Sequence, residues 1–351
     1  RENGFLQHDW VMCMLENFGG NVGLHGRMDQ LLENFYESKG HPLAAHLKGI
    51  GFTMEGSENN PVMYELMSEL PWRPERITKE EWIKEYAAAR YGKPHPAVDT
   101  AWSILAGSIY NCPRGNIQQG THESIFCCRP NLDNFQASSW SSMKNYYDPA
   151  STRAAAEAML AAADEFRGNN NFEYDLVDIV RQAVADHARL TYRHAIADYK
   201  AFNRQGFADN SRKFLRLLML QDSLLGTRPE FRVGTWTDYA KAAATNDDEA
   251  RQYEWNARAQ ITTWGARENA NDGKLRDYAH KEWNGILRDF YYPRWAAFFE
   301  SLTDELNGGT REEIDYYAME APWTQARNVY SSAPEGDVID TARAVFAKAF
   351  E

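Results

Sequence analysis

The arrangement of hydrophobic and polar positions gives the first part of the chain an alternating order of strands and helices. Residues 9–15 form a near-continuous apolar run, and residues 47–54 form a second one. Such runs are typical of strands that are buried on both faces of a parallel sheet. Helical spacing follows each run, over residues 24–36 and from Pro61 to Leu70, which predicts strand, helix, strand, helix with parallel pairing.

After about Pro74 no further convincing strand appears, and helix follows helix to the end of the chain. These helices are amphipathic without heptad regularity, which indicates a globular helical domain. Thr78 and Glu81 have the spacing of a capping box, and Gly92 is placed to end the same helix. The helices are expected over residues 79–91, 95–110, 151–166, 172–203, 207–225, 236–244, 249–264, 275–300 with an interruption at Pro293, 312–319 and 338–350.

The strand-containing part is incomplete. Two strands cannot close a barrel or make a stable open sheet. Either the chain begins within a (β/α) domain, or another polypeptide supplies the missing strands.

Composition narrows the classes of function. A net charge of −12 argues against a nucleic-acid partner, because a protein that neutralises phosphates needs a basic surface. No apolar run approaches the roughly 20 residues that a membrane-spanning helix needs. Aromatic residues reach 13%, with eleven Trp and eighteen Tyr. A surplus of Trp and Tyr is typical of pockets for carbohydrates and other hydrophilic ligands, since each offers a flat apolar face and a polar tip.

The cysteines and histidines form no motif for a metal ion. Cys13, Cys112, Cys127 and Cys128 fit no zinc-binding spacing, so we interpret them as buried free thiols. The chain also has no serine-nucleophile motif and no phosphate-binding loop. Carboxylate chemistry remains as the candidate.

Two carboxylates follow the two predicted strands. Glu55 ends the second apolar run and is bracketed by glycines, and barrel enzymes place catalytic groups at the carboxyl ends of such strands. Glu16 follows the first run and is a weaker candidate for the partner that glycoside hydrolysis requires. Asn17 and Asn21 offer amides that could bind sugar hydroxyl groups.

Two longer segments closely resemble hallmark segments of the α-N-acetylglucosaminidases, glycoside hydrolase family 89. They are WVMCMLENFGGN, residues 10–21, and MEGSENNPVMYELMSELPW, residues 54–72. Shorter matches continue in the same order along nearly the whole chain: residues 89–92, 95–96, 108–112, 260–265, 277–279 and 291–295.

The resemblance implies a fold class of α/β followed by all-α. Residues 1–75 would be the C-terminal part of a (β/α)8 catalytic barrel, with two of its strands, and residues 76–351 an all-α C-terminal domain. Family members are retaining exo-hydrolases that remove terminal α-linked N-acetylglucosamine from heparan sulfate or mucin-type glycans, without a cofactor. Their location, exported in bacteria or lysosomal in animals, is implied in the same way, and bacterial export is the weakly favoured expectation.

Residue by residue, Glu55 matches the nucleophile of the family. The acid/base glutamate belongs to an earlier barrel strand, which would precede Arg1 or lie in another chain. The resemblance therefore withdraws Glu16 as the partner, and we expect this chain alone to be inactive. Substrate-binding positions are matched by Trp264 and Tyr278, which the helical domain folds over the barrel mouth, less securely by Leu275, and by Asn17 and Trp10 near the active-site end.

The sequence departs from the family at Met54, where some relatives have Pro, and at Glu58, where others have an amide. Residues 267–274 form a longer break than in the animal enzymes, and this break connects two of the positions that match the sugar pocket. The alternative function is a non-catalytic helical accessory or glycan-binding module. A module that is stable alone should cover the edge of the strand at residues 9–15.

Overall fold

The computed structural model describes residues 5–56, 60–115, 120–121, 123–133, 137–138, 145–272 and 274–351. Contacts divide the chain into two units, residues 1–122 with 145–172 and residues 123–144 with 173–351. The predicted domain boundary after residue 75 marks the expected change from α/β to all-α structure. It does not coincide with the division by contacts, and it stays a prediction. Glu58, where the sequence departs from the family, lies outside the described residues.

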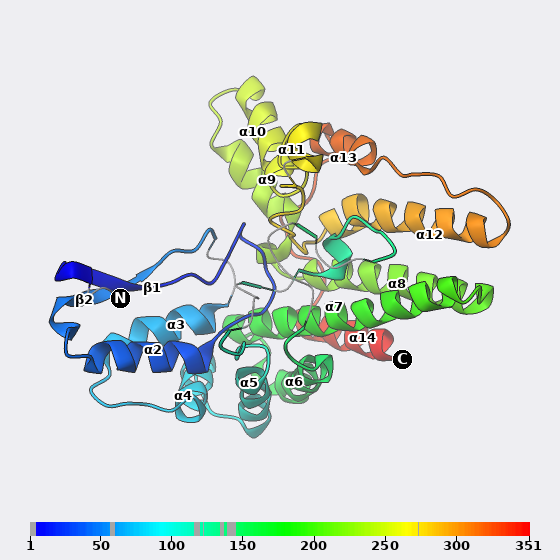
Figure 1. Ribbon diagram of the computed structural model, residues 1–351. Helices are drawn as coiled ribbons and strands as arrows, with labels where there is room; N and C mark the ends of the chain where they lie inside the picture. Colours follow the sequence, from blue (N-terminus) through cyan, green and yellow to red (C-terminus); the bar gives the residue numbers. More distant parts are fainter. Residues whose placement is uncertain are drawn as a thin grey trace. The chain divides into compact units, whose positions relative to one another are not determined.

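The first unit contains two parallel strands, and parallel pairing is confirmed (Figure 1). Trp10 pairs with Leu47 at the start of the strands, and Met14 pairs with Phe52 at their end. The elements of this unit are β1 (Trp10–Met14), α2 (Met28–Gly40), β2 (Leu47–Phe52), α3 (Pro61–Glu69), α4 (Lys79–Tyr91), α5 (Pro96–Gly107) and α6 (Pro149–Ala162), with 3-10 turns at Ala44–His46, Leu70–Trp72 and Ala163–Phe166.

Helix α4 has the bounds that its sequence predicts. The Thr78 hydroxyl accepts a hydrogen bond from the Glu81 N–H, and the Glu81 carboxylate accepts one from the Thr78 N–H, so the capping box is present. Gly92 ends the helix in the left-handed region with a φ of 81°. Buried aromatic side chains join α4 to α5, where the Trp102 indole donates to the Tyr91 hydroxyl over 2.9 Å.

The second unit consists of helices and connecting segments, with no strand among its described residues. Figure 1 shows the long α7 and α8 running side by side, and α12 and α14 both contact α8. The elements are a 3-10 turn at Ile125–Cys127, α7 (Asn170–Lys200, whose first turn belongs to the first unit), α8 (Arg204–Leu225), a 3-10 turn at Pro229–Phe231, α9 (Val233–Ala242), α10 (Asp247–Gln260), α11 (Arg267–Asn271), a π-helix at Leu287–Tyr291, α12 (Tyr292–Leu306), α13 (Tyr316–Gln325) and α14 (Val338–Phe350).

Some of the helix bounds expected for this unit are wrong. Helix α10 ends at Gln260 rather than at Trp264, and the break that follows contains the short helix α11. Residues 275–284 are not helical: Asp277 and His280 have positive φ angles, and the Asp277 N–H donates to the Thr262 carbonyl. Pro293 lies in the first turn of α12, directly after the π-helix Leu287–Tyr291, so the regular α-helical pattern is interrupted near this proline as expected.

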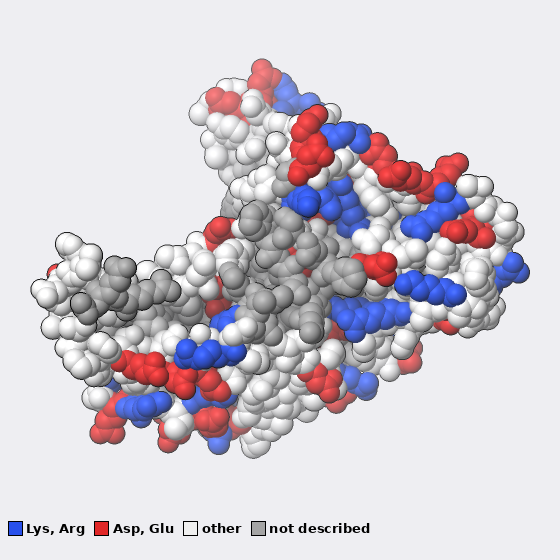
Figure 2. Space-filling model, viewed as in Figure 1, with Lys and Arg blue, Asp and Glu red and all other residues white. Residues whose placement is uncertain are grey.

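The expectation of four buried thiols is corrected at one position. Cys112, Cys127 and Cys128 are buried, whereas Cys13 is exposed. Cys13 and Val11 lie on the same face of β1, in line with Leu15 just beyond its end, and Val11 is 51% exposed. No helix in the described part of the chain is both long and apolar enough to span a bilayer. Figure 2 shows acidic and basic side chains interspersed over the visible face.

Candidate active site

Glu55 lies just beyond the carboxyl end of β2. Parallel strands bring their carboxyl ends to the same edge, and the ladder continues one step further because the Thr53 N–H donates to the Met14 carbonyl over 3.0 Å. The Glu55 N–H then donates to the Asn17 carbonyl over 3.2 Å. The Glu55 Oε2 atom in turn accepts from the Gly19 N–H over 2.7 Å. Two backbone contacts therefore fix both the chain and the carboxylate of an exposed residue.

The loop after β1 has a conformation that only small residues adopt easily. Gly19 and Gly20 have φ angles of 63° and 69°, in the left-handed region. The Asn17 side chain donates to the Asn21 carbonyl over 3.0 Å, and the Asn21 side chain donates to the Phe18 carbonyl over 2.8 Å. The two amides proposed for sugar hydroxyls thus brace this loop, and Asn17 and Glu55 are brought together by it.

Asn60 ties the same region to helix α3. Pro61 begins the helix as expected, but the Asn60 side chain makes no capping hydrogen bond to it. Its Oδ1 atom accepts from the His25 N–H over 3.0 Å, and its Nδ2 atom donates to the Gly23 carbonyl over 3.1 Å. Because Asn60 is fully buried, these bonds replace water for two backbone groups of the segment that follows the glycines.

Glu16 and Trp10 have surroundings that differ from those of Glu55. Burial raises the pKa of the Glu16 carboxyl well above its usual range, although the charge of Arg27 opposes this. Trp10 begins β1, at the end of the strand away from Glu55. The centre of its ring lies 5.1 Å from the ring centre of Phe5. The strand direction therefore does not bring Trp10 to Glu55.

In the second unit the three remaining predicted residues lie on one irregular segment. The ring centroids of Trp264 and Tyr278 are 5.4 Å apart in an edge-on contact, and the Tyr278 N–H donates to the Leu275 carbonyl over 3.2 Å. All three side chains are half-buried. Trp264 has a φ of 60°, which is uncommon for a bulky residue. Contacts with the surrounding residues must therefore hold this conformation.

A buried ion network holds that segment. The Asp277 carboxylate receives two hydrogen bonds of 3.0 Å from the guanidinium of Arg294, and the Asp277 N–H donates to the Thr262 carbonyl over 2.7 Å. Arg294 also pairs with Glu320 over 2.8 Å, and Glu320 in turn pairs with Arg129. Burial raises the pKa of Asp277 to about 6, against the opposing effect of Arg294. Sequence reasoning missed this network, because its members are scattered from residue 129 to residue 320.

A second buried carboxyl, Glu123, lies in the same unit. It accepts hydrogen bonds from the Ala137 N–H over 2.6 Å and the Ser138 N–H over 3.1 Å, and the Nδ1 atom of His280 is 3.7 Å away. Burial raises the pKa of Glu123 to about 7 and lowers that of His280 to about 3. Neither residue carried a sequence signal. The Glu123 carboxyl group thus holds the backbone of residues 137–138.

Two family models match the chain. Residues 1–74 match the tim-barrel domain of alpha-N-acetylglucosaminidase (NAGLU), and residues 82–348 match the C-terminal domain of the same protein. The human alpha-N-acetylglucosaminidase is 33% identical over 99% of this chain, which covers 46% of the human protein. The chain thus spans less than half the length of this curated relative.

Solved structures of a family 89 glycoside hydrolase from Clostridium perfringens are also similar. One holds its substrate GlcNAc-α-1,4-galactose, and another holds PUGNAc. Each matches with a TM-score of 0.93 and 33% identity over 99% of this chain and 40% of the other. The fold expected for the chain, the end of a barrel followed by helices, is confirmed by the two family models.

Proposed function

Because this chain belongs to the α-N-acetylglucosaminidases, glycoside hydrolase family 89, we propose that it contributes the nucleophile of a retaining glycosidase. The substrate is a glycan that ends in α-linked N-acetylglucosamine, of the heparan sulfate or mucin type. The nucleophile is Glu55. The acid/base carboxyl comes from residues outside this sequence.

The reaction is a double displacement. The Glu55 carboxylate attacks the anomeric carbon while the second carboxyl group gives its proton to the leaving glycosidic oxygen. Water then attacks the glycosyl-enzyme ester, and the second group, now a base, takes the proton of that water. The sugar leaves with its original configuration, and Glu55 is free again.

The observation that carries the proposal is the position and support of Glu55. Its carboxylate follows β2, lies at the exposed edge where barrel enzymes hold catalytic groups, and is aimed by the Gly19 N–H at 2.7 Å. A nucleophile must be accessible to the substrate and held in one direction. Glu55 meets both requirements.

Trp264, Tyr278 and Leu275 of the second unit are the substrate-binding residues of this proposal. The half-buried indole of Trp264 offers an apolar face that suits the C–H groups of a pyranose. Asn17 acts by positioning, since its carbonyl holds the Glu55 N–H. Trp10 lies at the far end of β1 and is left out of the proposed site.

The exposed face of β1 supports a larger catalytic domain. Val11 on β1 and Leu15 just beyond it are 51% and 46% exposed, and β1 pairs only with β2 within the described residues. An uncovered apolar edge strand promotes aggregation. Further barrel strands would cover it.

Hydrolysis of an aryl α-N-acetylglucosaminide tests the proposal. It is measured on this chain and on a chain extended upstream through the whole barrel. We expect activity in the extended protein alone, and Glu55→Ala should lower its kcat by at least about 1000-fold. Glu80→Ala, which removes an exposed carboxylate from α4, is the matched control and should leave kcat unchanged.

The outcomes separate two functions. If Glu55→Ala keeps its activity, Glu55 is not the nucleophile. If the extended protein hydrolyses nothing, the enzymatic proposal fails. A glycan-binding module then becomes the better function, because Trp264, Leu275 and Tyr278 lie together in the second unit without needing Glu55.

A further inference from the structure

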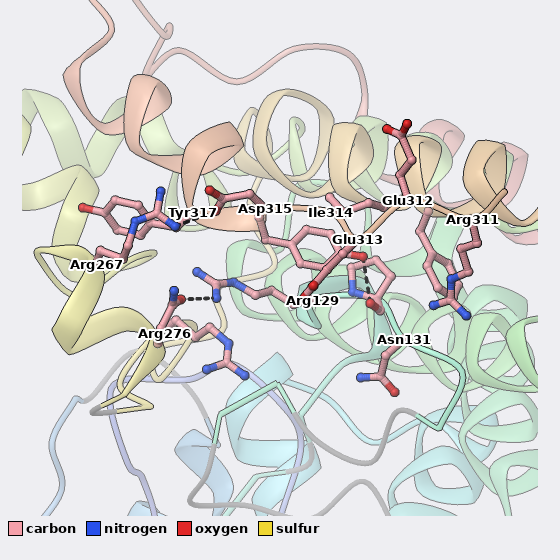
Figure 3. Close-up of a pocket in the computed structure, with 14 residues that line it drawn as sticks. Arg129, Asn131, Arg267, Arg276, Arg311, Glu312, Glu313, Ile314, Asp315 and Tyr317 are labelled. Atoms are coloured by element: carbon pink, nitrogen blue, oxygen red, sulfur yellow. Dashed lines mark hydrogen bonds and ion pairs between the residues drawn. The ribbon is translucent and has the colours of Figure 1, made fainter.

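An arginine-lined pocket lies in the second unit, beside the segment that carries Trp264 and Tyr278. Its volume is about 900 Å³, and Figure 3 shows the residues that line it. Four of them are arginines: Arg129, Arg267, Arg276 and Arg311. In Figure 3 the guanidinium groups of Arg129, Arg267 and Arg276 gather at one end of the pocket, whereas the Glu312 carboxylate points away from them.

Two of the three gathered arginines are held by other residues. Arg129 forms a bidentate ion pair with Glu320 and also donates to the Asn271 side chain over 2.6 Å. Arg267 pairs with Asp315 over 2.7 Å and lies 4.8 Å from the ring centre of Tyr317. Both guanidinium groups are therefore fixed in direction and compensated in charge.

Arg276 is different. Its Nη1 atom donates to the Ala270 carbonyl over 3.2 Å, while its Nε atom is buried and has no hydrogen-bond partner among the described residues. No described carboxylate forms an ion pair with Arg276. Burial, followed by the charge of Arg129, lowers the pKa of Arg276. A partly buried cation in this situation gains from an added anion.

The neighbouring charges do not supply that anion. Arg129 and Arg294 are balanced by Glu320 and Asp277 in the buried network. Asp315 is engaged by Arg267 and also accepts a hydrogen bond from the Ala318 N–H at the start of α13. Glu312 and Glu313 also line the pocket, and neither forms an ion pair with Arg276. Arg276 is therefore left without a carboxylate partner among the described residues.

We propose that Arg276, together with Arg129 and Arg267, binds an oxyanion: a sulfate, phosphate or carboxylate group. Planar guanidinium groups suit such oxygens, because each can donate two parallel hydrogen bonds. The pocket is far larger than a single ion and has the size of sites for small organic ligands. The oxyanion is thus carried on a molecule of about the size of one or two sugars. This inference needs no hydrolysis by the chain, so it stands or falls apart from the proposed function.

Calorimetric titration of this chain at constant ionic strength tests the site with four probes. They are inorganic sulfate, N-acetylglucosamine 6-sulfate, glucuronic acid and neutral N-acetylglucosamine. We expect the two charged sugars to bind more tightly than inorganic sulfate, and Arg276→Gln to weaken both at least about tenfold. Arg276→Lys keeps the charge but loses the planar guanidinium group. Its affinity for the charged sugars should lie between those of the unchanged chain and of Arg276→Gln.

Arg212→Gln is the matched control, since Arg212 is an exposed arginine on α8 that is paired with Asp209. It should bind every probe as the unchanged chain does. Equal affinity for inorganic sulfate and the charged sugars would assign the site to a free ion and overturn a carried oxyanion. Equal affinity for the neutral sugar, or undiminished binding by a folded Arg276→Gln protein, would overturn the site itself.

Discussion

The two units each hold a carboxylate at the centre of their candidate site residues, and they hold it in opposite ways. Glu55 is exposed and is fixed by the backbone N–H of Gly19. Asp277 is 0% exposed and is fixed by both terminal nitrogens of Arg294. A backbone donor directs a carboxylate without cancelling its charge, whereas a buried guanidinium cancels it. The first arrangement suits a group that reacts, and the second suits one that holds a segment in place.

The difference also separates what each carboxylate does for stability. A surface carboxylate such as Glu55 can be replaced at little cost in unfolding free energy. The Asp277–Arg294 pair is buried, so each partner depends on the other to offset the cost of desolvation. The segment with Trp264 and Tyr278 depends on this pair, because Asp277 lies next to Tyr278 and bonds back to Thr262.

Removal of Arg294 should have the largest effect on stability. Arg294→Met would leave Asp277 and Glu320 buried without this cation, and breaking a buried pair in this way costs about 3–5 kcal/mol of unfolding free energy. Thermal and urea unfolding measure the loss. Arg212→Met, at the exposed pair on α8, is the matched control and should cost less than about 1 kcal/mol. Equal losses in the two variants would contradict a structural role for the buried network.

Glu123 sharpens the comparison, because it is a buried carboxyl without a guanidinium pair among the described residues. Its pKa rises from 4.5 to about 7 on folding, mainly through burial. Between these values the unfolded chain has released the proton and the folded chain still holds it, so stability falls as pH rises from 4.5 to about 7. Glu123→Gln removes this dependence. Relative to the unchanged chain, the variant should gain up to about 3 kcal/mol across that window.

The difference between the two proteins is the quantity to measure, by urea unfolding at several pH values. His25 and His280 act in the opposite direction, because burial lowers both pKa values to about 3 and their contribution is lost as pH falls below 6.5. His25 is shared and cancels in the difference. His280 lies 3.7 Å from Glu123, so His280→Asn in both backgrounds controls for their coupling. A difference that stays constant from pH 4.5 to 7 would show that Glu123 is ionised throughout.

Sequence reasoning worked where a few neighbouring residues decide the structure. Helix α4 was predicted with its capping box, since Thr78 and Glu81 act within one turn. The strands were predicted from their apolar runs, and the position of Glu55 at the end of one follows from chain order alone. Such local features can be predicted from the sequence, because they do not depend on residues far away in the chain.

The remaining features depend on residues far apart in the chain. The segment of residues 275–284 has enough apolar residues to suggest a helix, but Asp277 is drawn out of helical geometry, with a φ of 54°, where it meets Arg294. Asn60 looks like a helix cap, yet its side chain serves His25 and Gly23 instead. In both cases a tertiary contact outweighs the local conformational preference, and no spacing of residues in the sequence predicts that contact.

Gly19→Ala gives the smallest effect and tests the first arrangement directly. At a φ of 63° an added Cβ costs about 1–2 kcal/mol, whereas the N–H that directs Glu55 is retained. Gly40→Ala is the matched control: Gly40 ends α2 without a positive φ, and its Cβ would meet nothing within 4 Å, so stability should be unchanged or slightly higher. Urea unfolding of both variants measures the costs. If Gly19→Ala is no less stable than Gly40→Ala, the loop relaxes freely, and the backbone of Gly19 cannot be what fixes the direction of the Glu55 carboxylate.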